Sequence, residues 1–438
     1  MKKTSLFFVG CFFVIALIAF NNSNFTTLNK PARVTIENTN GKYTLLVNNE
    51  PFYINGAGLE FGNIESLAKY KGNSFRTWRT NNGKNTALEV LDEAHKHGLM
   101  VTMGIEVARE RHGFDYNDQE KVDAQRERIR EEVNAIKDHP ALLIWSIGNE
   151  LNLRYSNPNV WNAVNDISKM IHEIDPNHPT TTTLAGISKR EILEINKRAP
   201  ELDILSFQVY GELGRLPKQV RSYGWTKPYM VTEWGATGHW EVPRTKWGAP
   251  IEENSTVKAK NYMIRYQKSM QIDSTQCLGS YVFLWGQKQE RTPTWYGVFT
   301  EDDKATESVD VMQYLWTGEW PENRSPQIKS FLLDGKDAYS SVTLQPNQSY
   351  EATVVATDPN EDPLTYSYEI LHESTDLKDG GDFEERPSSV QWKKIISENG
   401  KLRLTIPQEE GTYRIFVYVH DNKNHVGTAN IPFRVNKN

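Results

Sequence analysis

Between about residue 50 and residue 320, short apolar runs alternate with longer segments in which apolar residues recur at helical spacing. This alternation is typical of strands and helices that build a parallel sheet. Eight runs qualify as strands, and eight strands close a barrel. These runs are Phe52–Gly58, Ser74–Thr77, Met100–Ile105, Leu142–Ile147, Thr180–Leu184, Ile204–Val209, Tyr229–Thr232 and Gly279–Leu284.

Helical periodicity is visible between the runs. Leu88, Leu91 and Ala94 share one helical face before Gly98, and apolar residues line one face of the segments 122–136 and 160–174. An open doubly wound sheet is disfavoured because no glycine-rich phosphate loop follows the first strand. We therefore predict an α/β fold, with a (β/α)8 TIM barrel domain over residues 31–322 that includes a short N-terminal hairpin near Tyr43–Tyr53.

The pattern changes at Ser325-Pro326, where short alternating strands separated by Pro, Asn, Asp and Gly replace the helical periodicity. The predicted strands are Glu351–Thr357, Leu364–Ile370, Lys401–Ile406, Tyr413–His420 and Asn430–Val435. This style predicts an all-β, immunoglobulin-like sandwich over residues 325–438, with a boundary near 320–326. Because this segment contains no recognisable catalytic group, we expect it to anchor or space the substrate while the barrel alone turns over small substrates.

The N-terminus carries the pattern of a targeting signal. Lys2 and Lys3 precede an apolar run over Leu6–Phe20, so residues 1–24 are predicted to be a secretory signal peptide or an N-terminal anchor. Cys11 lies in the outline of a lipoprotein box, a weaker alternative. The expected location is secreted or periplasmic, with any membrane attachment made through this segment. Removing it leaves Cys277 as the single cysteine, so no intrachain disulfide is expected.

Charge narrows the classes of partner. The formal net charge is -6 over 438 residues, and the chain has no basic stripe suited to phosphate groups. Nucleic acid is therefore not an expected partner.

Two glutamates carry the candidate chemistry. Glu150 follows Asn149 directly after the run Leu142–Ile147, and Glu233 ends the run that begins at Tyr229. The ends of parallel barrel strands are where catalytic loops begin. Two carboxyl groups in one such pocket suit glycoside hydrolysis, which needs one protonated acid and one ionised carboxylate. Asn149 is placed to bind a sugar hydroxyl beside the bond that is cleaved.

The motifs Trp145-Ser-Ile-Gly-Asn-Glu150 and Val231-Thr-Glu-Trp-Gly235 resemble those of the clan A glycoside hydrolases, most closely the barrel of glycoside hydrolase family 2. The resemblance covers roughly residues 52 to 316. It implies a retaining mechanism with Glu150 as acid/base and Glu233 as nucleophile. It also implies that Arg76 holds the nucleophile ionised and that Tyr210 donates a hydrogen bond to it.

Trp285 in Phe-Leu-Trp-Gly matches the aromatic floor of the family's sugar subsite. Several other tryptophans lie near the motifs, and of these Trp234 is predicted to bind substrate, because flat aromatic faces pack against pyranose rings. The chain departs from the family at Arg79, where a histidine is common, and at Gln208, where an asparagine is common. Only about 25 residues precede the barrel after the predicted signal. These departures weigh against the family's usual galactosidase, glucuronidase and mannosidase identities.

Two weaker signals are interpreted as structural. The loop with Arg109 and His112 is expected to be mainly solvated, with contact to the site as the alternative. Asp358, Asn360 and Asp362, with Glu369, mimic the spacing of a calcium loop, but Pro363 stands where the sharp turn needs glycine. A polar turn is favoured over a cadherin-like calcium contact, and no metal or cofactor is predicted.

The sequence thus predicts a retaining β-glycosidase that acts on an oligosaccharide or polysaccharide, specifically a neutral β-linked glycan. A transglycosylase with the same site is the nearest alternative, because a sugar can replace water as the acceptor. A non-catalytic carbohydrate-binding protein is the alternative from another class.

Overall fold

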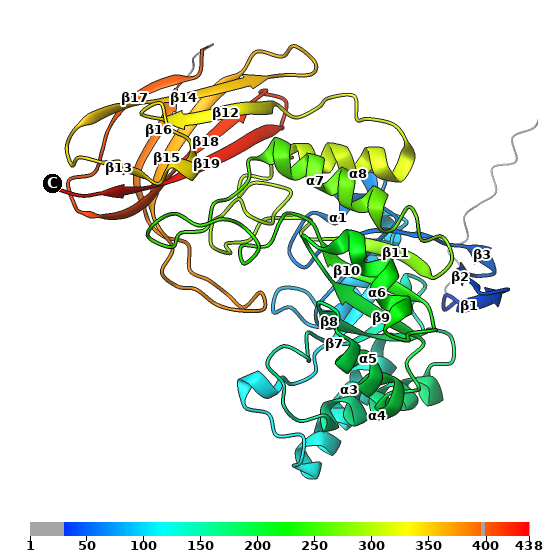
Figure 1. The fold of residues 1–438 in the computed structure, drawn as a ribbon. Coiled ribbons are helices and arrows are strands. Elements are labelled where there is room, and N and C mark those ends of the chain that lie inside the picture. Colours follow the sequence, from blue (N-terminus) through cyan, green and yellow to red (C-terminus); the bar gives the residue numbers. More distant parts are fainter. Residues whose placement is uncertain (1–29, 396–398, 438) are drawn as a thin grey trace, which may run out of the picture.

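The computed structural model describes residues 30–395 and 399–437. Eight parallel strands form a closed barrel, and helices surround it (Figure 1). Strand order around the barrel is β10-β11-β4-β5-β6-β7-β8-β9. The strands are β4 (Ile54–Gly58), β5 (Ser74–Arg76), β6 (Met100–Ile105), β7 (Leu142–Asn149), β8 (Thr180–Ala185), β9 (Ile204–Gln208), β10 (Tyr229–Trp234) and β11 (Cys277–Val282). The predicted TIM barrel is therefore confirmed.

The barrel helices are α1 (Ile64–Lys69), α2 (Ala87–Lys96), α3 (Gln119–Ile136), α4 (Asn159–Ile174), α5 (Lys189–Arg198), α6 (Leu216–Ser222), α7 (Ser255–Lys268) and α8 (Glu307–Thr317), with short 3-10 turns at Glu110–His112 and Leu213–Arg215. Local sequence explains where they begin. Thr86 and Glu89 form a reciprocal capping box at the start of α2. Helix α4 buries its apolar face, including Trp161 and Ile167, against the barrel. No helix in the described ranges is long and apolar enough to cross a membrane.

A small antiparallel sheet lies across the N-terminal end of the barrel. It consists of β1 (Val34–Thr39), β2 (Lys42–Val47) and β3 (Glu50–Pro51), so the predicted hairpin gains a third strand. Val34 and Leu45 pack with Ile54, Leu143 and other residues from the strand starts. The sheet therefore closes one end of the barrel and leaves the opposite mouth for the site.

The C-terminal region is a pair of β-sheets that lies beside α7 and α8 (Figure 1). One sheet has the order β12 (Gln327–Leu333), β14 (Ser349–Thr357), β17 (Lys401–Thr405). The other has the order β13 (Val342–Leu344), β19 (Val426–Val435), β18 (Gly411–His420), β15 (Thr365–His372), β16 (Ser389–Ile395), and a 3-10 turn spans Ala338–Ser340. We call this region the sandwich. Its immunoglobulin-like type and the predicted domain limits stay predictions.

Buried polar contacts join the sandwich to the barrel. Glu252 accepts hydrogen bonds from Lys258 Nζ at 2.5 Å and from Asn430 Nδ2 of the sandwich at 2.6 Å. Arg414 Nη2 donates to the carbonyl of Pro250 at 2.8 Å. Because buried polar groups are costly to leave unpaired, these bonds fix the orientation of the two parts.

The signal peptide or anchor predicted over residues 1–24 lies outside the described residues. Cys277 is a buried free cysteine in β11.

Candidate active site

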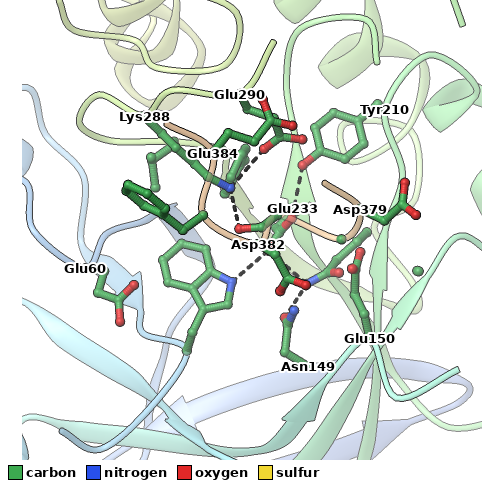
Figure 2. A pocket seen from close by; sticks show the side chains of 18 of the residues that line it. Glu60, Asn149, Glu150, Tyr210, Glu233, Lys288, Glu290, Asp379, Asp382 and Glu384 are labelled. Carbon is green, nitrogen blue, oxygen red and sulfur yellow. Dashed lines mark hydrogen bonds and ion pairs between the residues drawn. The ribbon is translucent and has the colours of Figure 1, made fainter. Parts of the chain in front are cut away.

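A large pocket opens where the barrel strands end, and both predicted glutamates line it (Figure 2). Its walls come from the loops that follow the barrel strands and from one segment of the sandwich. Glu233 is the next-to-last residue of β10, and Glu150 directly follows β7. The barrel therefore brings the two predicted residues to one site, as the ends of parallel strands must.

Glu233 lies at the centre of a set of hydrogen-bond donors. Trp78 Nε1 and Gln208 Nε2 donate to its Oε1 at 2.9 and 3.0 Å, and Arg76 Nη1 lies 3.3 Å from the same oxygen. The hydroxyl of Tyr210 donates to Oε2 at 3.0 Å. Four donors, one of them positively charged, thus converge on this one carboxyl group.

Tyr210 can act only as a donor here. Burial raises its pKa well above the ordinary value, and the neighbouring carboxylate of Glu233 raises it further. The phenol therefore keeps its proton and its bond to Glu233 across the neutral range.

Asn149 is oriented by the same network. Its Oδ1 accepts from Gln208 Nε2 at 2.7 Å, from Arg76 Nη2 at 2.8 Å and from Thr183 Oγ1 at 3.3 Å. With the oxygen fully engaged, the amide NH2 is the group left for the pocket that Asn149 lines. The side chain thus presents a donor to a ligand.

Glu150 differs from Glu233 in its surroundings. Burial raises the pKa of its carboxyl group to about 7, with a further increase from Glu233, while Arg111 and Arg109 act in the opposite direction. Its backbone has a φ of 52°, a left-handed conformation that is unfavourable for a residue with a side chain. The hydrogen bond from its N–H to the carbonyl of Thr183, 3.1 Å long, helps to hold this conformation. Glu150 therefore keeps a proton at pH values where an ordinary glutamate is ionised.

The two tryptophans predicted to bind substrate do not offer ring faces to the pocket. Trp234 is fully buried and packs against Tyr262 and Tyr266 of α7. Successive side chains of a strand point to opposite sides, so if Glu233 faces the barrel mouth, Trp234 must face the helices. The prediction that Trp234 binds substrate is wrong.

Trp285 borders the pocket, but its side chain is also fully buried. Its Nε1 donates to Ser66 Oγ at 2.8 Å, and its ring packs against Tyr70, Phe299 and Trp316. The ring supports the wall from behind, which corrects the expectation of an exposed aromatic floor.

Exposed rings occur instead at Phe61, Trp240 and Phe383, all of which line the pocket. Trp240 was among the tryptophans near the motifs, but no pattern in the sequence distinguished its exposure. Phe383 comes from the sandwich, which the sequence predicts to anchor or space the substrate and to contribute no catalytic group.

Two further residues of the site were missed. Trp78 donates to Glu233 and its ring lies over the guanidinium of Arg76, 4.6 Å from the ring centroid. Its place two residues after Arg76, just beyond β5, was the available signal. Gln208 was noted only as a departure from asparagine, although it bonds both Asn149 and Glu233.

The loop after β6 was expected to be mainly solvated. The structure places Arg109 and His112 in the pocket wall, and Arg109 Nε donates to the carbonyl of Asn149 at 3.2 Å. The alternative interpretation, contact with the site, is the one that holds.

Positive charges in the pocket wall are largely neutralised by protein carboxylates. The ion pairs are Arg79–Glu60, Arg109–Asp382, Arg154–Asp379, Lys288–Glu290 and Arg386–Glu369. Among the Lys and Arg residues that line the pocket, Lys84 is the one without an ion pair in the described structure, and its Nζ lies 4.8 Å from the ring centroid of Phe61.

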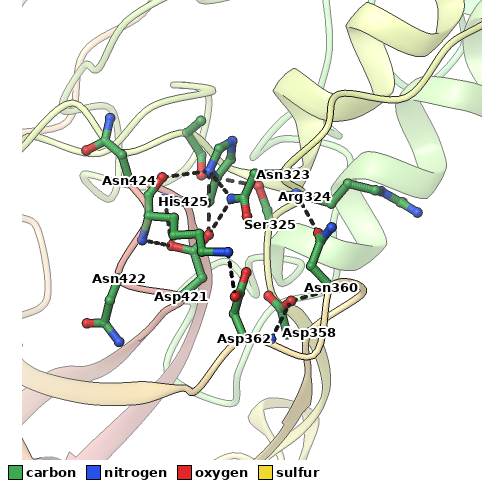
Figure 3. A network of polar contacts seen from close by, with 12 residues as sticks. Asn323, Arg324, Ser325, Asp358, Asn360, Asp362, Asp421, Asn422, Asn424 and His425 are labelled. Carbon is green, nitrogen blue, oxygen red and sulfur yellow. Dashed lines mark hydrogen bonds and ion pairs between the residues drawn. The ribbon is translucent and has the colours of Figure 1, made fainter.

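A separate cluster of carboxylates lies between the sandwich and the chain that leads into it (Figure 3). Asp358, Asp362 and Asp421 offer oxygens within 4.8 Å of one another. Each already accepts from the protein: Asp358 from backbone N–H groups, Asp362 from Lys423 and Asp421 from Asn323. Glu369, grouped with them by spacing, pairs with Arg386 instead. We assign no metal to this cluster.

Comparison with known proteins now adds to this geometry. The family model described as "Glycosyl hydrolases family 2, TIM barrel domain" matches residues 83–286, the part that carries both glutamates. The barrel of this chain is therefore similar to the TIM barrel domain of the family 2 glycosyl hydrolases. No curated protein sequence matches the chain.

Solved structures with a similar fold include Bacteroides uniformis beta-glucuronidase 2 covalently bound to cyclophellitol-6-carboxylate aziridine. Identity is 14%, the TM-score is 0.52, and the match covers 92% of this chain and 48% of that one. Bifidobacterium dentium beta-glucuronidase complexed with coumarin-3-O-glucuronide matches with 18% identity and a TM-score of 0.51, over 65% of this chain and 49% of that one. The chain thus spans about half the length of these glycoside hydrolases, and at such identities the likeness concerns the fold.

Proposed function

We propose that this protein is a retaining β-glycosidase of clan A in which Glu233 is the nucleophile and Glu150 the acid/base. The observation that carries the proposal is the asymmetry between the two carboxyl groups. Four donors converge on Glu233, whereas burial raises the pKa of Glu150 to about 7. One group is prepared to attack as a carboxylate and the other to give a proton, which is the division of labour that glycoside hydrolysis needs.

In the first step, an oxygen of Glu233 attacks the anomeric carbon while Glu150 protonates the departing glycosidic oxygen. The bond to the leaving group breaks, and a covalent glycosyl ester of Glu233 forms with inverted configuration. Glu150, now ionised, then removes a proton from water, which attacks the same carbon and releases Glu233. Two inversions give net retention. The NH2 of Asn149 is placed to donate to a sugar hydroxyl during both steps.

The substrate we propose is a neutral β-linked glycan. A uronic acid needs a cation for its carboxylate, but the described lysines and arginines that line the pocket are committed to ion pairs with the protein, except for Lys84, which contacts the ring of Phe61. This argument favours neutral sugars over a glucuronide such as the one in the Bifidobacterium dentium complex named above.

A transglycosylase would use the same covalent intermediate, with a sugar as acceptor in place of water. A carbohydrate-binding protein without activity is disfavoured, because binding alone requires no such difference between the two carboxyl groups. We also propose that the protein is exported, on the basis of its N-terminal sequence alone.

The test is a panel of β-linked oligosaccharides and aryl β-glycosides, with the anomer formed first followed by proton NMR. The proposal expects turnover of at least one neutral β-glycoside and a β-anomer as the initial product. An α-anomer would contradict retention, and absence of turnover across the panel would contradict the proposed activity. Product mixtures at high oligosaccharide concentration would separate hydrolysis from transglycosylation.

A further inference from the structure

One segment of the sandwich reaches the barrel mouth. It is the connection between β15 and β16, residues 373–388, which we call the sandwich loop (Figure 1). Residues 379 to 384 and Arg386 line the pocket together with Glu150 and Glu233. Figure 2 labels Asp379, Asp382 and Glu384 among the side chains of the pocket that holds the two glutamates.

The sandwich loop is anchored to the barrel on the side of β11. Lys288 Nζ donates to the carbonyl of Gly381 at 2.6 Å, and the backbone N–H of Arg291 donates to Glu384 at 2.6 Å. The guanidinium of Arg291 also pairs with Glu384, which is 2% exposed, and donates to the carbonyl of Lys378 at 3.0 Å. A buried, charge-assisted pair of this kind holds the loop in one position.

The sandwich loop is anchored on the opposite side as well, beside Glu150. Asp382 lies 3.2 Å from His112 Nε2 and 3.7 Å from both Arg109 Nη1 and Arg111 Nη2. Gly380 makes this approach possible, because it has a φ of +60° and an added Cβ would lie 2.7 Å from Arg111 Nη2.

The two arginines connect Asp382 to the acid/base motif. Arg109 Nε donates to the carbonyl of Asn149 at 3.2 Å, and Arg111 Nη1 donates to the carbonyl of Glu150 at 3.4 Å. The side chain of Arg111 is only 7% exposed. Asp382 therefore supplies negative charge to a largely buried cation that holds the backbone of Glu150.

The neighbouring residue offers a ring to the pocket. Phe383 is 81% exposed and lines the pocket, an unusual state for a large apolar side chain in a loop that is otherwise well anchored. Exposed aromatic side chains at the edge of a pocket are candidate ligand contacts.

We propose that the sandwich loop forms the leaving-group wall of the active site, with Asp382 as a positioning residue for Glu150 and Phe383 as the contact for the departing sugar. This inference rests on the proposed function, because it takes Glu150 to be the group that protonates the leaving oxygen. Whatever lies beside Glu150 then lies beside the leaving group. The ligand class is the sugar on the reducing-end side of the cleaved bond.

Glu150 is surrounded by charges from several elements. Those that disfavour its ionised form are Glu233 on β10 and Glu290 after β11, and those that favour it are Arg111, Arg109 and Arg76. Tyr210, after β9, stays neutral. Asp382 offsets the arginines on one side, so removing its charge leaves them free to stabilise the carboxylate of Glu150.

The first arm of the test compares Asp382→Asn, Asp382→Glu and the control Asp376→Asn. Asp376 belongs to the same loop, pairs with Lys378 and does not line the pocket. Asp382→Asn should move the alkaline limb of kcat/KM to lower pH, by up to about one pH unit. Asp382→Glu should restore most of that difference, and Asp376→Asn should leave the limb in place.

A carboxyl ¹³C NMR titration measures the effect of Asp382 on the pKa of Glu150 without an activity assay. The signal of Glu150 is assigned by its loss in Glu150→Gln, and its midpoint should fall in Asp382→Asn. An unchanged midpoint in a folded protein would overturn the role of Asp382.

The second arm compares Phe383→Ala with Leu377→Ala, an exposed residue of the same loop outside the pocket wall. On a β-linked oligosaccharide, Phe383→Ala should lower kcat/KM by about 3- to 10-fold, mainly through KM. On the corresponding glycosyl fluoride, whose leaving group is one atom, it should match the wild type. Leu377→Ala should match the wild type on both.

The outcomes separate this inference from the proposed function. If the wild type turns over oligosaccharides but Phe383→Ala behaves like it, or loses activity equally on the fluoride, the leaving-group wall is wrong while the function stands. If the wild type turns over nothing, the function fails. In that case, the affinities of the wild type and Phe383→Ala for the oligosaccharide are compared by calorimetry, and the NMR titration is carried out as above. Equal affinities would overturn the inference.

Discussion

The guanidinium of Arg76 lies 3.3 Å from Oε1 of Glu233, with the two side chains only 1% and 9% exposed. An ion pair so deeply buried is costly to break, because removing one partner leaves an uncompensated charge in the interior. Removing either partner should therefore lower the free energy of unfolding as well as disturb the site.

Arg76→Met should lower the free energy of unfolding by about 3–5 kcal/mol and abolish most activity, since Glu233 loses its positive partner. The double variant Arg76→Met/Glu233→Gln should recover much of the stability but none of the activity. Chemical denaturation measures both. Equal stabilities of the single and double variants would show that the pair is not what couples these residues.

Azide should separate the roles of the two glutamates. Glu233→Ala lacks the nucleophile, so azide should restore turnover of an activated β-glycoside and give the α-glycosyl azide. Glu150→Ala still forms the glycosyl ester, so azide should attack that ester and give the β-glycosyl azide. Mass spectrometry and NMR identify the products, and the opposite stereochemistry would exchange the two assignments.

The pH profile of kcat/KM should be bell-shaped with its alkaline limb near pH 7. Burial raises the pKa of Glu150 to about 7, and a general acid is lost as pH rises through that value. For substrates whose leaving group needs no protonation, the rate of glycosyl-ester formation should lack this alkaline limb. A limb near pH 4.5 on unactivated substrates would contradict the assignment of Glu150.

Selectivity should favour neutral sugars. Because the described lysines and arginines that line the pocket, apart from Lys84, are paired with carboxylates, an aryl β-glucuronide should be turned over at least about tenfold more slowly than the best neutral aryl β-glycoside. Measured kcat/KM values at pH 6 decide this. Preference for the glucuronide would mean that an ion pair such as Lys288–Glu290 opens to bind it.

The contribution of Asp310, at the junction with the sandwich, to the free energy of unfolding should fall between pH 4 and pH 6. Burial raises the pKa of Asp310 from 3.8 to about 6, so the protonated form favours the folded state and this contribution is lost as pH rises through 6. In the wild type, the backbone N–H of Ser325 donates to Asp310 at 2.7 Å. Asp310→Asn keeps an oxygen acceptor for this bond.

That variant should therefore unfold at a higher temperature than the wild type at pH 7.5 and show a smaller advantage, or none, at pH 4. The size expected at pH 7.5 is on the order of 1–3 kcal/mol. Asp334→Asn, at an exposed ion pair of the sandwich, is the control. A pH-independent difference would show that ionisation of Asp310 is not the cause.

The sequence was a good guide where local pattern decides structure. Every predicted barrel strand lies within two residues of an observed one at each end, because short apolar runs bounded by helices have few alternatives. One pocket brings together both glutamates, Asn149 and Tyr210, and Arg76 contacts Glu233. The residues meet because the C-terminal ends of all strands of a parallel barrel lie at the same end.

Other features could not be predicted from local pattern alone. Trp234 was misassigned although strand alternation, applied to its neighbour Glu233, would have placed it among the helices. The approach of Asp382 to His112 joins residues from different parts of the molecule, 270 positions apart, and depends on how the sandwich packs on the barrel. No periodicity or motif in either segment predicts how the two parts pack.

The buried bonds of Glu252 to Lys258 and Asn430 have a consequence for how such enzymes diversify. They fix the orientation of the sandwich on the barrel without using the loop between β15 and β16, so the residues of that loop that make no anchoring contact can vary while the loop still reaches the pocket. If the proposed function and the proposed leaving-group wall are correct, the barrel carries the chemistry and the sandwich loop carries the choice of leaving group. Exchanging the rest of that loop while keeping Asp382 and Glu384 should therefore redirect substrate preference and leave the protonation of Glu150 in place.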